Sequence, residues 1–164
     1  MALQSKLLVY AAIAALLVLL GGIFWFGSLD IPELEEVRIE LTDIEILSVN
    51  KIENTAKLSV TFLVTNPSEK TFTVPLIGYQ LYADNVLLGS GQYSTVDIAM
   101  PGRAIFSSGA EIPLKNTFDL SLSDVNNEIY QAILDDKIKS FRAEGVITTE
   151  SAWSTVEKEF NSST

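Results

Sequence analysis

The chain has 164 residues, of which 48% are hydrophobic and 20% charged, and its formal net charge is −10 at pH 7. It contains no histidine and no cysteine. This excludes the commonest general base, the commonest zinc ligands, thiolate nucleophiles and disulfide bonds. The acidic balance also disfavours nucleic acid as a partner, because a phosphate-binding surface needs basic residues.

An apolar run without charged side chains fills residues 7–27. Because a helix of about 20 residues crosses a hydrocarbon core of ~30 Å, we expect one transmembrane helix held by membrane lipids. Lys6 precedes the run and Arg38 is the nearest basic residue after it. The positive-inside rule therefore predicts a cytoplasmic segment at 1–6 and an extracytoplasmic C-terminal domain, with Trp25 and Phe26 at the headgroup level.

A cleaved signal peptide is the alternative interpretation of this run. Signal peptides have an apolar region of ~7–15 residues that ends in a small-residue cleavage site. Here the run is longer, and Phe24, Trp25 and Phe26 occupy the position where small residues are needed. We therefore predict an uncleaved, single-pass anchor in the cell membrane.

The segment after the anchor is acidic. Residues 28–36 contain Pro32 and four acidic side chains, and self-repulsion predicts a short extended stalk. The chain after the anchor has about 135 residues, enough for one hydrophobic core. We expect one domain at 37–160 and a tail at 161–164.

Short apolar alternations with a period of two predict about seven strands. The expected strands are 37–49, 59–64, 71–83, 86–100, 104–114, 141–148 and 154–160, with turns at 66–68, 84–85, 101–102 and 115–116. Residues 123–139 instead carry apolar residues at spacings of three and four, which predict one amphipathic helix. The expected fold is mainly β: an immunoglobulin- or fibronectin-III-like β-sandwich with one late α-helix, preceded by a transmembrane helix.

The order of elements between residues 58 and 91 is recognisable. An alternating strand ends in Asn66-Pro67, a second strand covers 72–82, and a stretch of small residues follows at 87–91; a later helix and a strand with Gly145 complete the order. In this order the chain resembles the water-stress and hypersensitive-response (WHy) domain of the group 2 late embryogenesis abundant (LEA-2) family, in its membrane-anchored form. The resemblance spans 37–160. It implies a β-sandwich with a part in stress response, such as desiccation, and no catalysis.

The motif residues have physical roles that need no ligand. Pro67 lacks a backbone donor and ends the strand ladder, while Asn66 is able to accept a local turn hydrogen bond. Glycines in strands allow a bulge or a close strand crossing. The residues interpreted in this way as structural family-motif positions are Asn66, Pro67, Gly78, Gly89, Gly91 and Gly145.

Two further features are secondary candidates for chemistry. Glu40, Asp43 and Glu45 form an acidic cluster on one predicted strand, where Asp43 and Glu45 share a face. That pattern suits calcium or acid–base catalysis, but it is also typical of any solvated strand face. Asn161 begins an Asn-Ser-Ser sequence that suits N-glycosylation. We expect no catalytic residue, no metal ligand and no cofactor.

These observations predict a non-catalytic, membrane-anchored stress-response module that protects or binds other macromolecules. The alternative is an accessory subunit of a larger membrane or cell-envelope protein complex, because small residues in the span allow close helix packing; these are Ala11, Ala12, Ala14, Ala15, Gly21 and Gly22. A third hypothesis is a carrier that holds an apolar ligand between the two sheets. Neither nucleic acid nor a small-molecule substrate is expected as a partner.

Overall fold

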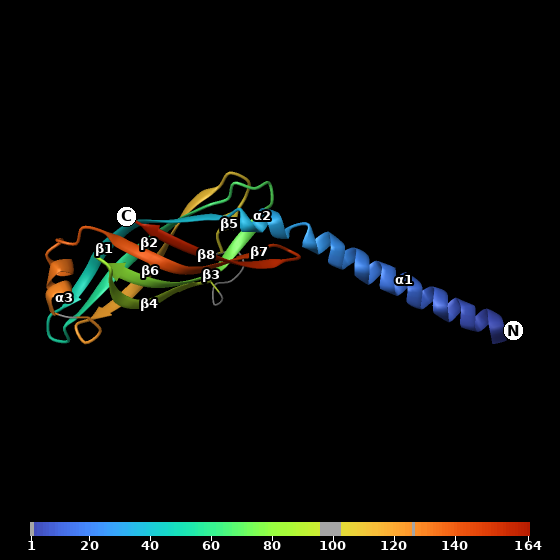
Figure 1. Ribbon diagram of the computed structural model, residues 1–164, viewed down its shortest axis with the longest axis horizontal. Helices are drawn as coiled ribbons and strands as arrows, with labels where there is room; N and C mark the ends of the chain where they lie inside the picture. The colour runs from blue at the N-terminus through green and yellow to red at the C-terminus, as the bar shows by residue number, and fades with distance from the viewer. Residues whose placement is uncertain (1, 96–102, 126) are drawn as a thin grey trace.

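The computed structural model describes residues 2–95, 103–125 and 127–164 (Figure 1). A long helix, α1 (Ala2–Ser28), projects from a β-sandwich, and a short helix, α2 (Ile31–Glu35), lies at the junction between them. The expected architecture of one N-terminal apolar helix followed by a β-sandwich is confirmed.

The described residues form eight strands in two antiparallel sheets. One sheet has the order β1-β2-β6, from β1 (Arg38–Asn50), β2 (Thr55–Thr65) and β6 (Glu111–Ser121). The other has the order β4-β3-β7-β8, from β3 (Phe72–Ala83), β4 (Val86–Ser94), β7 (Phe141–Glu150) and β8 (Thr155–Ser163), and β5 (Ile105–Phe106) also pairs with β3. The turn between β3 and β4 is as predicted: Asp84 and Asn85 have φ of 44° and 67°, which is typical of a two-residue hairpin.

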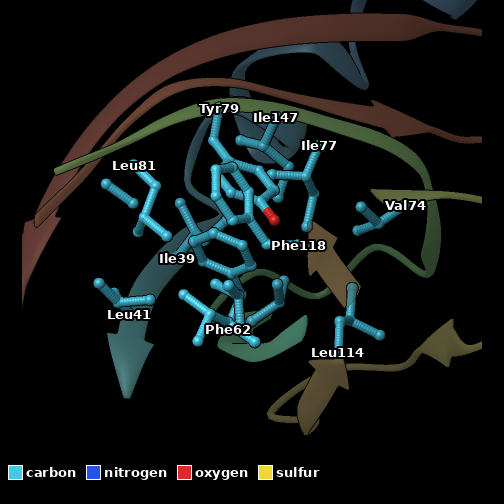
Figure 2. Packing of buried hydrophobic residues seen from close by; sticks show 14 of the residues in the cluster. Ile39, Leu41, Phe62, Val74, Ile77, Tyr79, Leu81, Leu114, Phe118 and Ile147 are labelled. Atoms are coloured by element: carbon cyan, nitrogen blue, oxygen red, sulfur yellow. The ribbon is translucent and has the colours of Figure 1, made fainter. Parts of the chain in front are cut away.

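The hydrophobic core lies between the inner faces of the two sheets (Figure 2). Phe62 of β2 meets Tyr79 of β3 edge to face, with ring centroids 4.9 Å apart. Phe118 of β6 lies 6.5 Å from the same tyrosine ring, and Phe160 of β8 lies 5.8 Å from Phe62. Aromatic rings from both sheets therefore fill the interior and hold the sheets together.

The segment expected as an extended stalk is not extended. Residues 31–35 form α2, with Pro32 at its start, where proline is well tolerated. Leu34 is completely buried against the sandwich. Burying a leucine stabilises by ~1.5–3 kcal/mol, which outweighs the repulsion between carboxylates that water screens. The acidic segment is therefore part of the folded domain.

The late helix is shorter than predicted. The structure has α3 (Asn127–Leu134) in place of 123–139. Before it, Asp124 N donates to Ser121 O (3.0 Å) and closes a turn. After it, Lys137 N donates to Ala132 O (2.8 Å) and Asp136 N to Ile133 O (3.1 Å), with Asp136 at φ 55°. These bonds form a Schellman motif, which ends the helix earlier than the hydrophobic pattern indicates.

Two strand predictions were wrong. The expected strand at 104–114 is divided into β5 and the start of β6 by a turn in which Gly109 has φ 72° and Ala110 N donates to Ser107 O (2.9 Å). The expected turn at 115–116 lies inside β6. Its polar residue on the core side, Asn116, donates to Tyr79 Oη (2.8 Å), so the strand continues because this amide has a partner.

The other boundaries differ at their ends. The strand predicted for 154–160 extends to Ser163, so most of the expected tail belongs to β8. The strand predicted for 86–100 is β4, which ends at Ser94. The predicted turn at 101–102 and the last part of that strand lie outside the described residues.

Candidate functional site

Helix α1 is the strongest functional feature of the molecule. Among the described residues it is the one helix long and apolar enough to cross a membrane, and none of its apolar window is buried against the rest of the chain. Leu16, Leu19 and Phe24 are more than half exposed. Such a surface is stable in lipid and unfavourable in water, so α1 fits either a single-pass anchor or a signal sequence.

The end of the sandwich next to α1 is held to it by polar contacts. We call residues 27–37, 66–71 and 151–154 the α1-proximal end. Ser154 Oγ donates to Gly27 O (2.6 Å), the last glycine of α1. Lys158 Nζ donates to Glu35 O and to Val37 O, both at 2.7 Å. The carbonyl groups that follow α1 are therefore bound by side chains from β8 and the turn before it.

An ion pair between a buried carboxylate and a partly exposed lysine lies at the same end. Asp30 is 6% exposed, and its Oδ1 is 3.0 Å from Lys70 Nζ. The hydrogen bond from Lys70 to Asp30, with the attraction between their charges, raises the pKa of Lys70 above its usual 10.5. Ser151 Oγ lies 3.4 Å from the other oxygen of Asp30. The carboxylate thus connects α2 to the loop after β2 and to the turn before β8.

Asn66 holds the loop after β2 from inside the protein. It is completely buried, and its Nδ2 donates to Lys70 O (2.7 Å) and Phe106 O (2.9 Å). Its Oδ1 accepts from Ser68 N (3.0 Å) and Ser68 Oγ (2.9 Å), which forms the local turn that the sequence suggests. Pro67 beside it is exposed. All the polar atoms of the Asn66 side chain are occupied within the protein, so none is directed at a ligand.

The motif glycines fall into three groups by their surroundings. At Gly145 a methyl group would overlap with the carbonyl oxygen of Gly78, and at Gly91 it would overlap with the Tyr79 ring. Gly89 has φ 146°, next to a shift of register between β3 and β4. At Gly78 nothing lies within 4 Å of an added methyl group. Close packing therefore requires glycine at positions 91 and 145, and backbone geometry favours it at position 89. At position 78 there is room for a larger side chain.

The acidic candidates lie on the outer face of the three-stranded sheet. Glu40 pairs with Leu63, Asp43 with Thr61 and Glu45 with Ser59, so the three side chains point to the same side. All three are exposed. In the part of the chain that the structure describes, no group of three or more histidine, cysteine or acidic side chains is suitably arranged to hold a metal ion.

An open groove of about 830 Å³ crosses the outer face of the second sheet. Gly78, which carries no side chain, lies in its floor, and its border includes Gln80, Glu144 and Asn161. Asn161 is exposed in the edge strand β8, opposite Glu144. Ligand sites are usually concave, apolar and enclosing, whereas this groove is open and bordered by polar groups, so it suits surface contact more than enclosure of a substrate.

A polar cluster lies beside the groove. Tyr82 Oη donates to Glu144 Oε1 (2.6 Å), Arg142 pairs with Glu144, and the Arg142 guanidinium lies 4.2 Å from the centre of the Tyr82 ring. The hydrogen bond to the carboxylate raises the pKa of Tyr82 and lowers the pKa of Glu144. Each group stabilises the other in its usual charge state at neutral pH, so the cluster acts as a structural network.

Comparison with solved structures supports the fold. A protein of Arabidopsis thaliana is 14% identical, with a TM-score of 0.57 over 77% of this chain and 78% of that one. A protein of Archaeoglobus fulgidus is 13% identical, with a TM-score of 0.50 over 77% of this chain and 94% of that one. A structure provisionally named as a late embryogenesis abundant (LEA) protein is 12% identical, with a TM-score of 0.46 over 94% and 86%.

No protein-family model matches the chain, and no curated protein matches it in sequence. At identities of 12–14% the structural likeness concerns the fold alone. The names of these three proteins describe no catalytic activity.

Sequence reasoning missed the contacts at the α1-proximal end. Asp30, Lys70 and Ser151 lie in three separate segments, so no local pattern connects them. One signal was available: of two tryptophans in the chain, Trp153 is the one outside the apolar run. The structure agrees with the fold that the resemblance implies: two antiparallel sheets pack as a β-sandwich, preceded by one helix long and apolar enough to span a membrane.

Proposed function

We propose that this chain is a membrane-anchored, extracytoplasmic LEA-2-like domain that acts as a non-catalytic stress-response module, protecting or binding other macromolecules. One observation carries the proposal: none of the apolar window of α1 is buried, yet this helix is joined to a domain with a core of its own. A helix that the sandwich does not need for packing has lipid as its natural environment.

The absence of histidine and cysteine supports a role without catalysis. The buried polar residues Asn66 and Ser68 bond to each other and to the backbone, whereas catalytic groups have free polar atoms directed into a cleft. The acidic candidates at 40, 43 and 45 are exposed on an outer face. A fully folded sandwich with an acidic surface is suited to stay soluble and to make weak contacts.

The filled interior argues against a carrier of apolar ligands. Phe62, Tyr79 and Phe118 occupy the space between the sheets, with ring centroids 4.9 and 6.5 Å apart (Figure 2). An apolar ligand would have to displace these rings, at a cost of ~1.5–3 kcal/mol for each aromatic side chain that loses its burial. Binding at the surface is the mode that this core allows.

An accessory subunit in a larger complex is the second candidate, favoured by one feature. At the end opposite α1, residues 46–52 expose apolar side chains, with Leu47 at 55% and Ile52 at 93% exposure. Such a surface is typical of a contact site for another protein. Stoichiometric recovery of other membrane proteins with the full chain from mild detergent would support this role over that of an independent module.

The anchor is tested with the full chain expressed in cells. Leu16→Lys with Leu19→Lys places two charges in the apolar run, each costing about 2.5–3.5 kcal/mol on insertion. We expect the double variant to leave the membrane fraction in alkaline carbonate, while the unchanged chain stays. Leu47→Lys, a substitution at an exposed leucine of the sandwich, is the matched control. Retention of the double variant, or release of the unchanged chain, would refute the anchor.

The orientation is tested by single cysteines, because the chain has none of its own. Ser48→Cys lies on the exposed part of β1, and Ser5→Cys precedes the apolar run. In intact cells, a maleimide that cannot cross membranes should label Ser48→Cys, and label Ser5→Cys only after lysis. The reverse pattern contradicts the extracytoplasmic domain, and loss of the N-terminal segment from the intact mass contradicts the uncleaved anchor.

A further inference from the structure

The turn between β7 and β8 brings a tryptophan to the end of α1. Residues 151–154 form this turn, and Figure 1 shows the β7–β8 hairpin reaching toward the helix. A methyl group placed on Gly27 would lie 3.6 Å from Trp153 O and 3.7 Å from Trp153 Cβ. The side chain of Trp153 is nevertheless 64% exposed. A large aromatic side chain thus lies beside the helix and is mostly uncovered by protein.

The position of this turn is fixed by hydrogen bonds. Ser151 N donates to Ser154 O (2.8 Å), and Ser151 Oγ accepts from Ser154 N (3.1 Å) and Trp153 N (3.3 Å). Ser154 Oγ in turn donates to Gly27 O (2.6 Å). The backbone that carries Trp153 is therefore hydrogen-bonded directly to the last turn of α1.

The height of Trp153 follows from the length of the apolar run. Residues 7–27 rise by about 30 Å as a helix, the thickness of the hydrocarbon core. Gly27 therefore marks the outer boundary of the hydrocarbon, and Trp153 beside it lies at the headgroup level. Indole rings favour this level because they combine an apolar body with one polar N–H.

The composition around Trp153 suits the same environment. The turn 151–154 has no charged residue, although the chain as a whole is strongly acidic. Exposed apolar side chains continue on the neighbouring segment, with Leu29 at 52% and Ile31 at 39% exposure. Phe26, in the last turns of α1, is 59% exposed. These exposed apolar residues lie at the end of α1 and on the segment that follows it, on the same side of the domain as the turn that carries Trp153.

We propose that Trp153 inserts at the lipid headgroup level as a second membrane contact, which holds the sandwich in one orientation against the bilayer. This inference rests on the proposed function, since it requires α1 to span the membrane. We assign the bilayer as the partner of the exposed indole ring, because the turn lies beside the last turn of the span. A second copy of the chain or another protein on this face is a different outcome of the test.

The two tryptophans allow a direct test in the full chain. Trp25→Phe leaves Trp153 as the single tryptophan, and Trp153→Phe leaves Trp25. Each variant is reconstituted in phosphatidylcholine vesicles whose lipids carry bromine either near the headgroup or deep in the acyl chains. For Trp153 we expect a blue-shifted emission, stronger quenching by the shallow bromines than by the deep ones, and weak quenching by acrylamide.

The negative control lies at the opposite end of the sandwich. Ile52, 93% exposed, is replaced by tryptophan in a chain that lacks both natural tryptophans. Its fluorescence should be severalfold more sensitive to acrylamide than that of Trp153 and insensitive to bromine. Far-UV circular dichroism of each sample confirms that the sandwich is folded before quenching is compared.

The outcomes separate this inference from the proposed function. Quenching of Trp25 by brominated lipid without quenching of Trp153 keeps the anchor and overturns the second contact. Shielding of Trp153 from acrylamide without quenching by bromine indicates that protein covers it, which also overturns the inference. Absence of quenching for both tryptophans refutes the anchor itself.

Discussion

The two ends of the sandwich differ in how their side chains are used. At the α1-proximal end, the buried polar residues Asp30, Asn66 and Ser68 have partners among side chains and backbone. At the far end, which comprises residues 46–55, 84–85, 121–125 and 127–141, apolar side chains such as Ile52 are exposed, and the buried hydroxyl of Tyr130 has no partner among the described residues. Buried polar contacts thus join the domain to its helix, whereas the far end exposes apolar side chains.

Leucines at the two ends provide the most sensitive test of this difference. Leu34 of α2 is completely buried, and Leu47 of β1 is 55% exposed. Leu34→Ala should lower the free energy of unfolding by about 3 kcal/mol, because it removes buried methyl groups and leaves a cavity. Leu47→Ala should change it by about 0.5 kcal/mol or less. Denaturant unfolding of the full chain in mild detergent measures both, and equal effects would show that α2 is not docked.

Asn66 and Pro67 are adjacent, yet they should respond differently. Asn66→Ala removes hydrogen bonds to Lys70 O, Phe106 O and Ser68 N inside the protein. Each lost bond costs about 1 kcal/mol and unpaired buried groups cost more, so we expect a loss of about 3 kcal/mol in the same assay. Pro67→Ala at the exposed neighbouring position should cost ~0.4–1 kcal/mol through the unfolded chain. A larger loss from the proline variant would contradict the role assigned to the asparagine.

The paired strands β3 and β7 run between the two ends, and two glycines in this pair have different surroundings. A methyl group at 145 would overlap with Gly78 O, while one at 78 meets nothing within 4 Å. Gly145→Ala should therefore separate β3 from β7 and cost about 2 kcal/mol, as expected for overpacking. Gly78→Ala should be close to neutral, within about 0.5 kcal/mol. Amide hydrogen exchange in Gly145→Ala should rise in both β3 and β7. If it rises only in β7, the pairing of these strands does not connect the two ends.

The part of this fold that the sequence predicts is the part encoded locally. The alternation in β2 and the Asp84-Asn85 turn depend on neighbouring residues, and both were predicted correctly. The predictions that were wrong depend on tertiary contacts. Asn116 remains in a strand because Tyr79 accepts its hydrogen bond, and α2 forms because Leu34 is buried against the sandwich. The position of Trp153 beside Gly27 depends on a β7–β8 hairpin more than one hundred residues further along the chain, which no local pattern contains.

Two buried tyrosines differ in whether their hydroxyl groups have a hydrogen-bond partner, one at the far end and one in the core. Tyr130 of α3 is 2% exposed and its hydroxyl has no partner among the described residues, whereas Tyr79 Oη accepts from Asn116. Tyr130→Phe should stabilise the protein by about 1 kcal/mol, since it removes a buried unpaired group, and Tyr79→Phe should destabilise it by about the same amount. Destabilisation by Tyr130→Phe would indicate that water bonds to this hydroxyl, so that the buried polar group at the far end has a partner after all.

The smallest expected effect is a dependence of thermal stability on pH. It involves Tyr82, next to the far end, which donates a hydrogen bond to Glu144 Oε1. This hydrogen bond, together with the charge of Arg142, lowers the pKa of Glu144 below its usual 4.5. A carboxyl group with a lowered pKa in the folded state contributes stability above its unfolded pKa, and that contribution is lost as the pH falls through the folded value. Tyr82→Phe should therefore lower the thermal midpoint at pH 7, and the difference from the unchanged protein should narrow below about pH 4.5.

Tyr93→Phe is the matched control for this pH dependence. Tyr93 is half-buried, and burial alone raises the pKa of its hydroxyl, so removing that hydroxyl should shift the thermal midpoint equally at neutral and acid pH. If the effect of Tyr82→Phe is also constant from neutral to acid pH, the hydrogen bond to Glu144 contributes nothing to folding. Tyr82 and Glu144, which lie next to the far end, would then add no restraint to it, and the contrast with the end that holds Asp30 and Asn66 would be sharper.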